Sequence, residues 1–171
     1  IAIIEIKDMP EIRALGRCIL FDGSLFLVFK NMEWAKYTST CQALKMHLAY
    51  ELNRMIPVQF ISSEANYSER KVFMELLEAG VTYITDRGYL AFDIFQQVTE
   101  KQAFFITRIR YNIRASIQTV LEVNIPESWN FYLSEVTDAL VIFSGDKSKV
   151  TYRLVCFYVF GEWYRITTNR L

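Results

Sequence analysis

Apolar residues form short runs with the length and alternation of β-strands through the first part of the chain. Residues 18–29 predict a long strand, and residues 44–52 and 55–62 predict two more, joined by a short loop as a hairpin. Pro57 lacks a backbone donor, which favours an edge or a bulge for the third strand. Three consecutive strands are therefore expected.

Helical periodicity follows and alternates with strand-like runs. Phe73, Leu76 and Leu77 recur at i, i+3 and i+4, which predicts a helix over residues 66–79. Gly80 stands where a helix-ending glycine is typical. The next segments are a strand at 81–85, a helix at 89–101 and a strand at 103–110. This order, β-β-β-α-β-α-β, predicts an α/β fold with a mixed sheet and helices on its faces.

Only β-rich segments follow residue 115. Gly145-Asp146 and Gly161-Glu162 are typical of hairpin turns between them. We therefore expect two parts, with residues 1–115 as the first part of an α/β core and residues 116–171 as an inserted antiparallel β lobe. The expected strands of the lobe are 117–124, 129–135, 138–144, 149–160 and 163–168.

Composition narrows the class of protein. The chain has 171 residues, of which 52% are hydrophobic, enough for a sizeable core. No apolar run reaches the roughly 18–20 residues that span a bilayer, so we expect a soluble, cytoplasmic protein with no membrane contact. The net charge is zero, which mildly opposes a strong nucleic-acid binder. Ile1 begins the chain and a strand-like run ends it, so a fragment of a longer protein is expected.

The cysteines do not indicate a disulfide framework or a zinc site. Cys18, Cys41 and Cys156 are odd in number and far apart along the chain. Cys18 and Cys156 lie within apolar runs. Packed, reduced thiols in a cytosolic protein fit this pattern best.

Two aspartates stand where α/β sheets collect ligands. Asp86 directly follows the strand 81–85, and Asp22 lies in the apolar run 18–29. Ligands bind outside the carboxyl ends of such strands, and paired carboxylates suit divalent metals. The blander interpretations are a turn for Asp22, because Asp-Gly is a turn dipeptide, and a helix N-cap for Asp86.

Five short segments, in order along nearly the whole chain, carry a resemblance to a known family. They are Phe21-Asp22-Gly23-Ser24-Leu25-Phe26, Lys45-Met46-His47-Leu48, Tyr83-Ile84-Thr85-Asp86-Arg87-Gly88-Tyr89, Leu154-Val155-Cys156-Phe157 and Ile166-Thr167-Thr168-Asn169-Arg170. Together with the element order, they resemble bacterial DDE transposases of insertion sequence family four. The resemblance implies a ribonuclease H-like catalytic domain interrupted by a β lobe.

By this resemblance Asp22 and Asp86 are the first two acids of an Asp-Asp-Glu triad and ligands of two Mg²⁺ ions, for which Mn²⁺ is a possible substitute. The third acid belongs to a helix beyond the lobe, so the chain is expected to stop short of it and to be inactive alone. The implied reaction is phosphodiester hydrolysis and strand transfer at insertion-sequence ends. The implied partners are double-stranded DNA, as transposon ends and target, and a second copy in a homodimer of the full protein.

Basic and aromatic residues near these acids are candidate DNA contacts. Lys45 and His47 share one strand face, and Arg87 and Tyr89 lie beside Asp86. The bland interpretations are a solvated face for Lys45, a satisfied structural histidine for His47 and helix-start packing for Arg87 and Tyr89.

A second group of candidate contacts lies near and beyond the end of the strand 103–110. Arg108, Arg110 and Arg114 would neutralise backbone phosphates. Stacking on an unpaired base is conceivable for Trp34, Trp129 or Trp163, and Trp129 in the expected lobe is the one selected for testing. Solvated surface and core packing are the commoner roles of such residues.

Two other functions stay open at this stage. One is a non-catalytic DNA-binding module on the same fold, either decayed or domesticated. The other is a structure-specific nuclease that uses the same acids. Fold alone does not separate these functions.

Overall fold

Strands and short helices alternate along the residues that the computed structural model describes, which are 9–29, 32, 35, 37, 38, 41–89, 91–129 and 131–171. The strands are β1 (Cys18–Leu27), β2 (Ala43–Glu51), β3 (Ile56–Glu64), β4 (Thr82–Thr85), β5 (Phe104–Arg108), β6 (Ala115–Val120), β7 (Leu133–Phe143), β8 (Thr151–Val159) and β9 (Glu162–Thr168). The helices are α1 (Pro10–Ala14), α2 (Glu69–Glu75) and α3 (Phe92–Glu100), with 3₁₀ turns η2 (Arg87–Tyr89) and η3 (Glu127–Trp129). From β1 to β5 the order is the predicted one.

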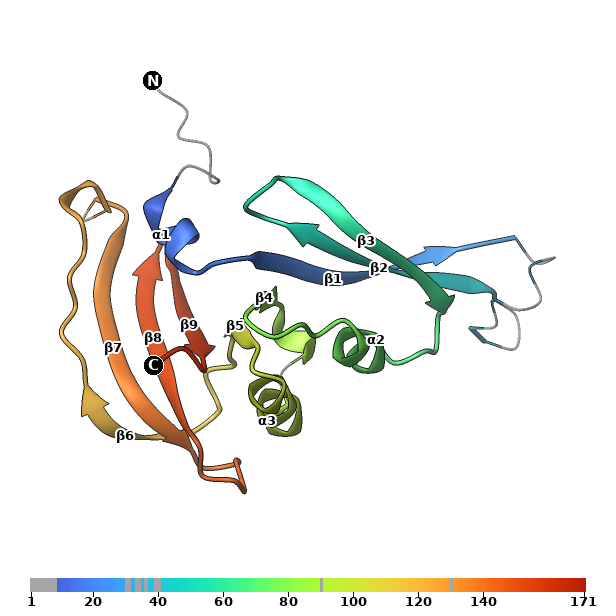
Figure 1. Ribbon diagram of the computed structural model, residues 1–171. Coiled ribbons are helices and arrows are strands. Elements are labelled where there is room, and N and C mark those ends of the chain that lie inside the picture. The colour runs from blue at the N-terminus through green and yellow to red at the C-terminus, as the bar shows by residue number, and fades with distance from the viewer. Residues whose placement is uncertain are drawn as a thin grey trace.

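The nine strands form one mixed sheet in the order β3-β2-β1-β4-β5-β9-β8-β7-β6. The central strands β1, β4 and β5 run parallel, and all the other pairings are antiparallel. Figure 1 shows α2 and α3 side by side on one face of the central strands. The result is a mixed α/β fold with few helices, consistent with the ribonuclease H-like architecture that the sequence resembles.

The lobe expected after residue 115 continues the core sheet. β9 pairs with β5 from Ile106↔Thr168 to Arg108↔Ile166. β8, β7 and β6 then follow outward in antiparallel register. Residues 116–171 therefore extend the sheet sideways (Figure 1).

β7 is a single strand of eleven residues where two strands were expected. Its register shifts between Ser134 and Thr137, and Glu135 has a φ of 53°. The bulge lies in a polar stretch whose composition is typical of a turn. A bulge places an unpaired residue within a continuous strand, so the strand does not end there.

The helices are shorter than their apolar stripes predict. The expected helix 66–79 is α2, of seven residues, and the expected helix 89–101 is α3, of nine residues, with the turn η2 just before it. No described helix has both the length and the apolar character needed to cross a bilayer.

Aromatic rings fill the space between the helices and the sheet. Phe95 of α3 stacks on Phe105 of β5 with ring centroids 4.0 Å apart. Phe73 of α2 meets Tyr83 of β4 edge-on at 5.4 Å. Full burial of one large apolar side chain contributes roughly 1.5–3 kcal/mol, so this helical face supplies much of the stability.

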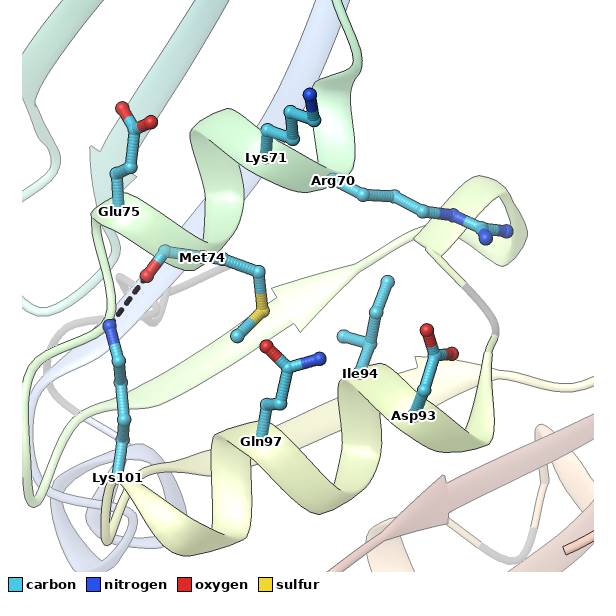
Figure 2. Close-up of a pocket in the computed structure, with 8 residues that line it drawn as sticks. All are labelled: Arg70, Lys71, Met74, Glu75, Asp93, Ile94, Gln97 and Lys101. Atoms are coloured by element: carbon cyan, nitrogen blue, oxygen red, sulfur yellow. Dashed lines mark hydrogen bonds between the residues drawn. The ribbon is translucent and has the colours of Figure 1, made fainter.

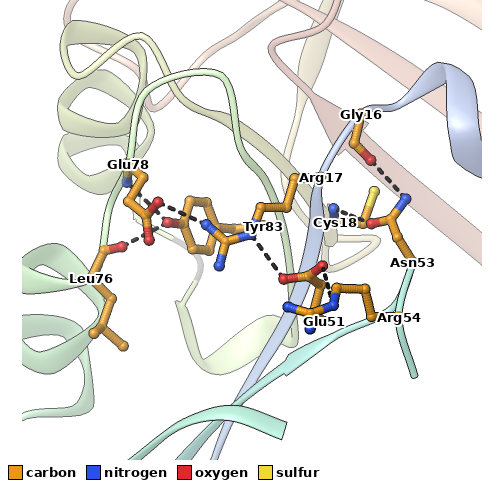
Figure 3. A network of polar contacts seen from close by, with 9 residues as sticks. All are labelled: Gly16, Arg17, Cys18, Glu51, Asn53, Arg54, Leu76, Glu78 and Tyr83. Carbon is orange, nitrogen blue, oxygen red and sulfur yellow. Dashed lines mark hydrogen bonds and ion pairs between the residues drawn. The ribbon is translucent and has the colours of Figure 1, made fainter. Parts of the chain in front are cut away.

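A polar network fixes the start of β1 against the segment before β4 (Figure 3). Arg17 donates to Glu51 at 3.0 Å and to Glu78 at 2.7 Å, which joins the end of β2 to the loop that follows α2. The Tyr83 hydroxyl donates to the Leu76 carbonyl at 2.6 Å and accepts from the Glu78 N–H at 2.9 Å. The network helps to hold β1, β2 and β4 in a fixed register at this end of the sheet.

Candidate active site

Asp22 lies in the middle of β1, opposite Leu48 of β2. Gly23 also pairs within the strand, opposite His47, so the Asp-Gly dipeptide is not a turn. The Asp22 side chain is exposed, whereas the preceding Phe21 is buried under the helices. Asp22 therefore points to the face of the sheet that α2 and α3 leave open, because successive side chains of a strand alternate between faces.

Asp86 follows the last residue of β4 and stands level with Asp22. β1 and β4 pair in parallel from Cys18↔Thr82 to Leu20↔Ile84. Continuing this register by two residues brings Asp86 beside Asp22. Both aspartates line one pocket of about 470 Å³ on the open face, together with Leu20, Phe21, Leu48, Tyr50, Ile84 and Thr85.

A tight turn holds the Asp86 carboxylate. Its Oδ1 accepts a hydrogen bond from the Gly88 N–H at 2.7 Å. The Thr107 hydroxyl donates to the carbonyls of Asp86, at 3.0 Å, and Thr85, at 3.1 Å. The cap position of α3 is Ala91, which makes no side-chain cap. Asp86 thus closes the turn η2 and does not cap α3.

The two carboxylates fit part of a Mg²⁺ site. Mg²⁺ prefers oxygen ligands and is often held by one or two carboxylates with water and phosphate. Among the described residues, no cluster of three or more His, Cys, Asp or Glu side chains is placed to hold a metal. Asp22 and Asp86 would therefore supply two ligands of a larger set.

Lys45 and His47 share a strand face, but it is the helical face, opposite to the Asp22 side chain. Lys45 pairs with Glu69 of α2 at 3.1 Å. His47 is only 1% exposed; its Nε2 lies 3.0 Å from the Ser63 hydroxyl. Burial lowers the His47 pKa, against an opposing effect of Glu69 and with a further lowering by Lys45. In this position His47 is a buried, packed residue.

Tyr89 is likewise a packed residue. It is 2% exposed, and its ring meets Phe21 and Phe73 edge-on, each at 5.5 Å. Phe21 precedes Asp22, and Tyr89 lies three residues after Asp86. The ring therefore ties the turn of Asp86 to the strand of Asp22.

A basic pocket of about 450 Å³ lies at the carboxyl end of β5. Its lining contains three arginines and two large aromatic residues: Arg87, Arg108, Ile109, Tyr111, Cys156, Trp163 and Arg165. The Arg108 guanidinium lies 4.2 Å above the Tyr164 ring. Arg165 donates to the carbonyls of residues 110, 111 and 113 and so holds that loop. One of its lining residues, Arg87, directly follows Asp86 in the chain, so the basic pocket lies next to the acidic site.

The other candidate DNA contacts are dispersed. Arg110 and Arg114 are exposed but do not line the basic pocket. Trp129 lines a different pocket, with Ile12 of α1 and with Met9, which precedes that helix. Trp163, which is 52% exposed, is the tryptophan of the basic pocket. Trp34 lies outside the described residues.

A groove between α2 and α3 carries mixed charge (Figure 2). Arg70, Lys71 and Lys101 line it with Glu75 and Asp93. Figure 2 shows Arg70 extending toward η2, and its guanidinium lies 3.4 Å from the Gly88 carbonyl. Arg70 thereby supports the turn of Asp86 from the side of the helices.

The sequence also matches known proteins. The family model described as transposase DDE domain matches residues 13–160, and the chain belongs to this family. A protein of Sinorhizobium fredii with the name "Putative transposase y4zB" is 25% identical over 139 residues, which cover 80% of this chain and 39% of that protein. The chain thus spans less than half the length of this relative.

Proposed function

We propose that the chain forms most of the catalytic core of a cut-and-paste DNA transposase of the insertion sequence family four type. The observation that carries this proposal is the parallel register of β1 and β4, which brings Asp22 and Asp86 to one pocket on the open face. The family match supports the class of reaction. The specific steps, phosphodiester hydrolysis at an insertion-sequence end and then strand transfer, are part of the proposal.

Asp22 and Asp86 would hold Mg²⁺, or Mn²⁺ in its place, through their carboxylate oxygens. The metal, as one or two ions, would polarise the scissile phosphodiester and lower the pKa of a bound water. The hydrogen bond from the Gly88 N–H fixes one carboxylate oxygen of Asp86, and Asp86 lines the pocket beside Asp22. A glutamate from outside these 171 residues would complete the ligand set, and the chain alone would then be inactive.

In this proposal, the basic pocket beside Asp86 binds the DNA strand. Arg87 and Arg108 would neutralise phosphates, and the faces of Tyr111 and Trp163 would pack against sugar or base. Arg110 and Arg114 are exposed nearby and would add salt-dependent attraction. In the proposal, the full protein acts as a homodimer on double-stranded DNA in the bacterial cytoplasm.

The test uses the complete protein that contains this chain. Asp22→Asn and Asp86→Asn should each abolish Mg²⁺-dependent nicking of matched transposon ends in a gel assay. DNA binding, measured by fluorescence anisotropy, should change less than about threefold, because the phosphate contacts dominate affinity. Asp93→Asn is the matched control, since Asp93 is an exposed acid in the groove of α2 and α3. Nicking that survives both substitutions at the proposed site would place the chemistry elsewhere.

The basic pocket beside Asp86 would also serve a non-catalytic DNA-binding module, which is the second candidate. For such a module, the complete protein would bind DNA and show no nicking before any substitution. A structure-specific nuclease would instead cut branched DNA regardless of the transposon-end sequence.

A further inference from the structure

Glu69 was not selected from the sequence, yet its side chain lies against the strand that carries Asp22. A Cβ atom added at Gly23 would lie 3.1 Å from Glu69 Cδ and 3.2 Å from its Cγ and Oε1. These distances are tighter than most Cβ contacts, so a side chain at residue 23 would push Glu69 aside by a few tenths of an ångström. The carboxylate of Glu69 therefore sits behind β1, on the helical face, next to the residue that follows Asp22.

Lys45 accompanies Glu69 in this position. Its Nζ lies 3.1 Å from Glu69 Oε1 and donates to the Tyr67 carbonyl at 3.3 Å. The exposed fractions of the two side chains are 17% and 33%, so solvent screens this pair less than a pair on the open surface. The positive charge of Lys45 is thus offset locally by Glu69, close to β1.

The buried hydroxyl of Tyr89 lies within the field of three carboxylates. Burial raises the pKa of this hydroxyl most, and the charges of Glu69, Asp22 and Asp86, together with hydrogen bonding to Glu69, raise it further. Glu69 also lies against Gly23, the residue after Asp22, so its carboxylate comes near the two aspartates from the other face of the sheet.

We propose that Glu69 and Lys45 are a positioning pair whose balance of charge tunes the affinity of the Asp22–Asp86 site for divalent cations. Glu69 adds negative charge behind the site, and Lys45 limits that charge. Neither side chain touches the metal, since both lie on the helical face. The inference rests on the proposed metal-binding role of Asp22 and Asp86.

The experiment measures Mn²⁺ binding to the full chain by electron paramagnetic resonance of free Mn²⁺. Glu69→Gln removes one negative charge and leaves Lys45 uncompensated, so the dissociation constant should rise about threefold to tenfold, as one nearby unit charge in a partly screened environment permits. Lys45→Met should lower it about threefold. The double variant should return to within about twofold of the parent chain, because the two charges offset each other.

Two controls separate charge from folding. Glu75→Gln neutralises an exposed acid of the same helix and should leave Mn²⁺ binding unchanged. Asp22→Asn should remove most of the binding. Thermal unfolding monitored by circular dichroism identifies any variant that is simply less stable.

The outcomes are distinguishable. Binding that depends on Asp22 but is the same in Glu69→Gln and Lys45→Met would overturn the positioning pair and leave the proposed function intact. Single variants that lower the melting temperature without changing Mn²⁺ affinity would assign the pair a purely structural role and overturn the inference as well. Mn²⁺ binding that ignores Asp22, or no binding by the parent chain, would overturn both the inference and the metal-binding proposal.

Discussion

The two faces of the central sheet differ in what covers them. On the face toward α2 and α3, Phe73 and Phe105 are almost fully buried among other rings. On the opposite face, Leu20 and Ile84 are half-buried and line a pocket with the two aspartates. Packing on one face supplies stability, which allows the other face to place carboxylates side by side. Such like charges destabilise each other unless a cation or water compensates them.

The largest expected effect is on the free energy of unfolding. It is tested by substituting two neighbouring residues of β5 whose side chains point to opposite faces of the sheet. Phe105→Ala should lower the free energy of unfolding by about 3–5 kcal/mol, because it empties a buried site stacked on Phe95. Ile106→Ala, on the half-buried open face, should cost less than about 2 kcal/mol. Urea unfolding followed by circular dichroism measures both values. Equal losses for the two variants would show that the open face is packed as tightly as the helical face.

An intermediate effect is expected at the turn of Asp86. A Cβ atom at Gly88 would lie 2.9 Å from Asp86 Oδ1, so Gly88→Ala should turn the carboxylate away from its present position. The end of a side chain moves easily, and the φ of Gly88 is not positive. Stability should therefore change little, while Mn²⁺ affinity should fall about tenfold, which corresponds to about 1.4 kcal/mol. A variant with unchanged Mn²⁺ affinity would argue against Asp86 as a ligand.

The smallest expected effect concerns His47 on the packed face. Burial holds the His47 pKa below its usual value in the folded chain, so the unfolded chain takes up a proton first as the pH falls. Stability should therefore decline below about pH 6.5 and stop declining from this cause below the folded pKa. Unfolding free energies between pH 7.5 and 5.5 should show this slope in the parent chain and a smaller one in His47→Gln, because His47 is the only histidine. If the parent chain and His47→Gln show the same dependence of stability on pH, the lowered pKa of His47 in the folded chain is wrong.

The sequence predicts the elements around the acids well because their patterns are local. The apolar run before Asp86 is bounded by Gly80 at its start and by a polar turn at its end. The predicted strand 81–85 therefore agrees with β4 to within one residue. The polar stretch inside β7 could not be interpreted in this way. A bulge and a turn have the same composition, and only pairing with β8 distinguishes them.

The choice of face and the contacts across the sheet lie beyond such patterns. Period two correctly puts Lys45 and His47 on one face, but only the pairing of Gly23 with His47 shows that Asp22 faces the other way. The one feature of the sequence that is related to Glu69 is Gly23, the glycine after Asp22. That glycine can be interpreted only once the contact between residues 23 and 69, which are 46 positions apart, is known. Likewise, the selection of Trp129 over Trp163 depends on which strand returns to β5.

The pairing of β9 with β5 brings together the two ends of the segment that forms β6, β7 and β8. The Ile109 N–H donates to the Arg165 carbonyl at 2.8 Å, so the chain leaves the core and returns to it at adjacent points. In outline, β5 and β9 are the two arms of one hairpin, and everything between them is an enlarged loop. Segments with neighbouring ends are the kind that evolution inserts, lengthens or removes without disturbing the host fold. The strands that bear the two aspartates can thus stay constant while this excursion diversifies.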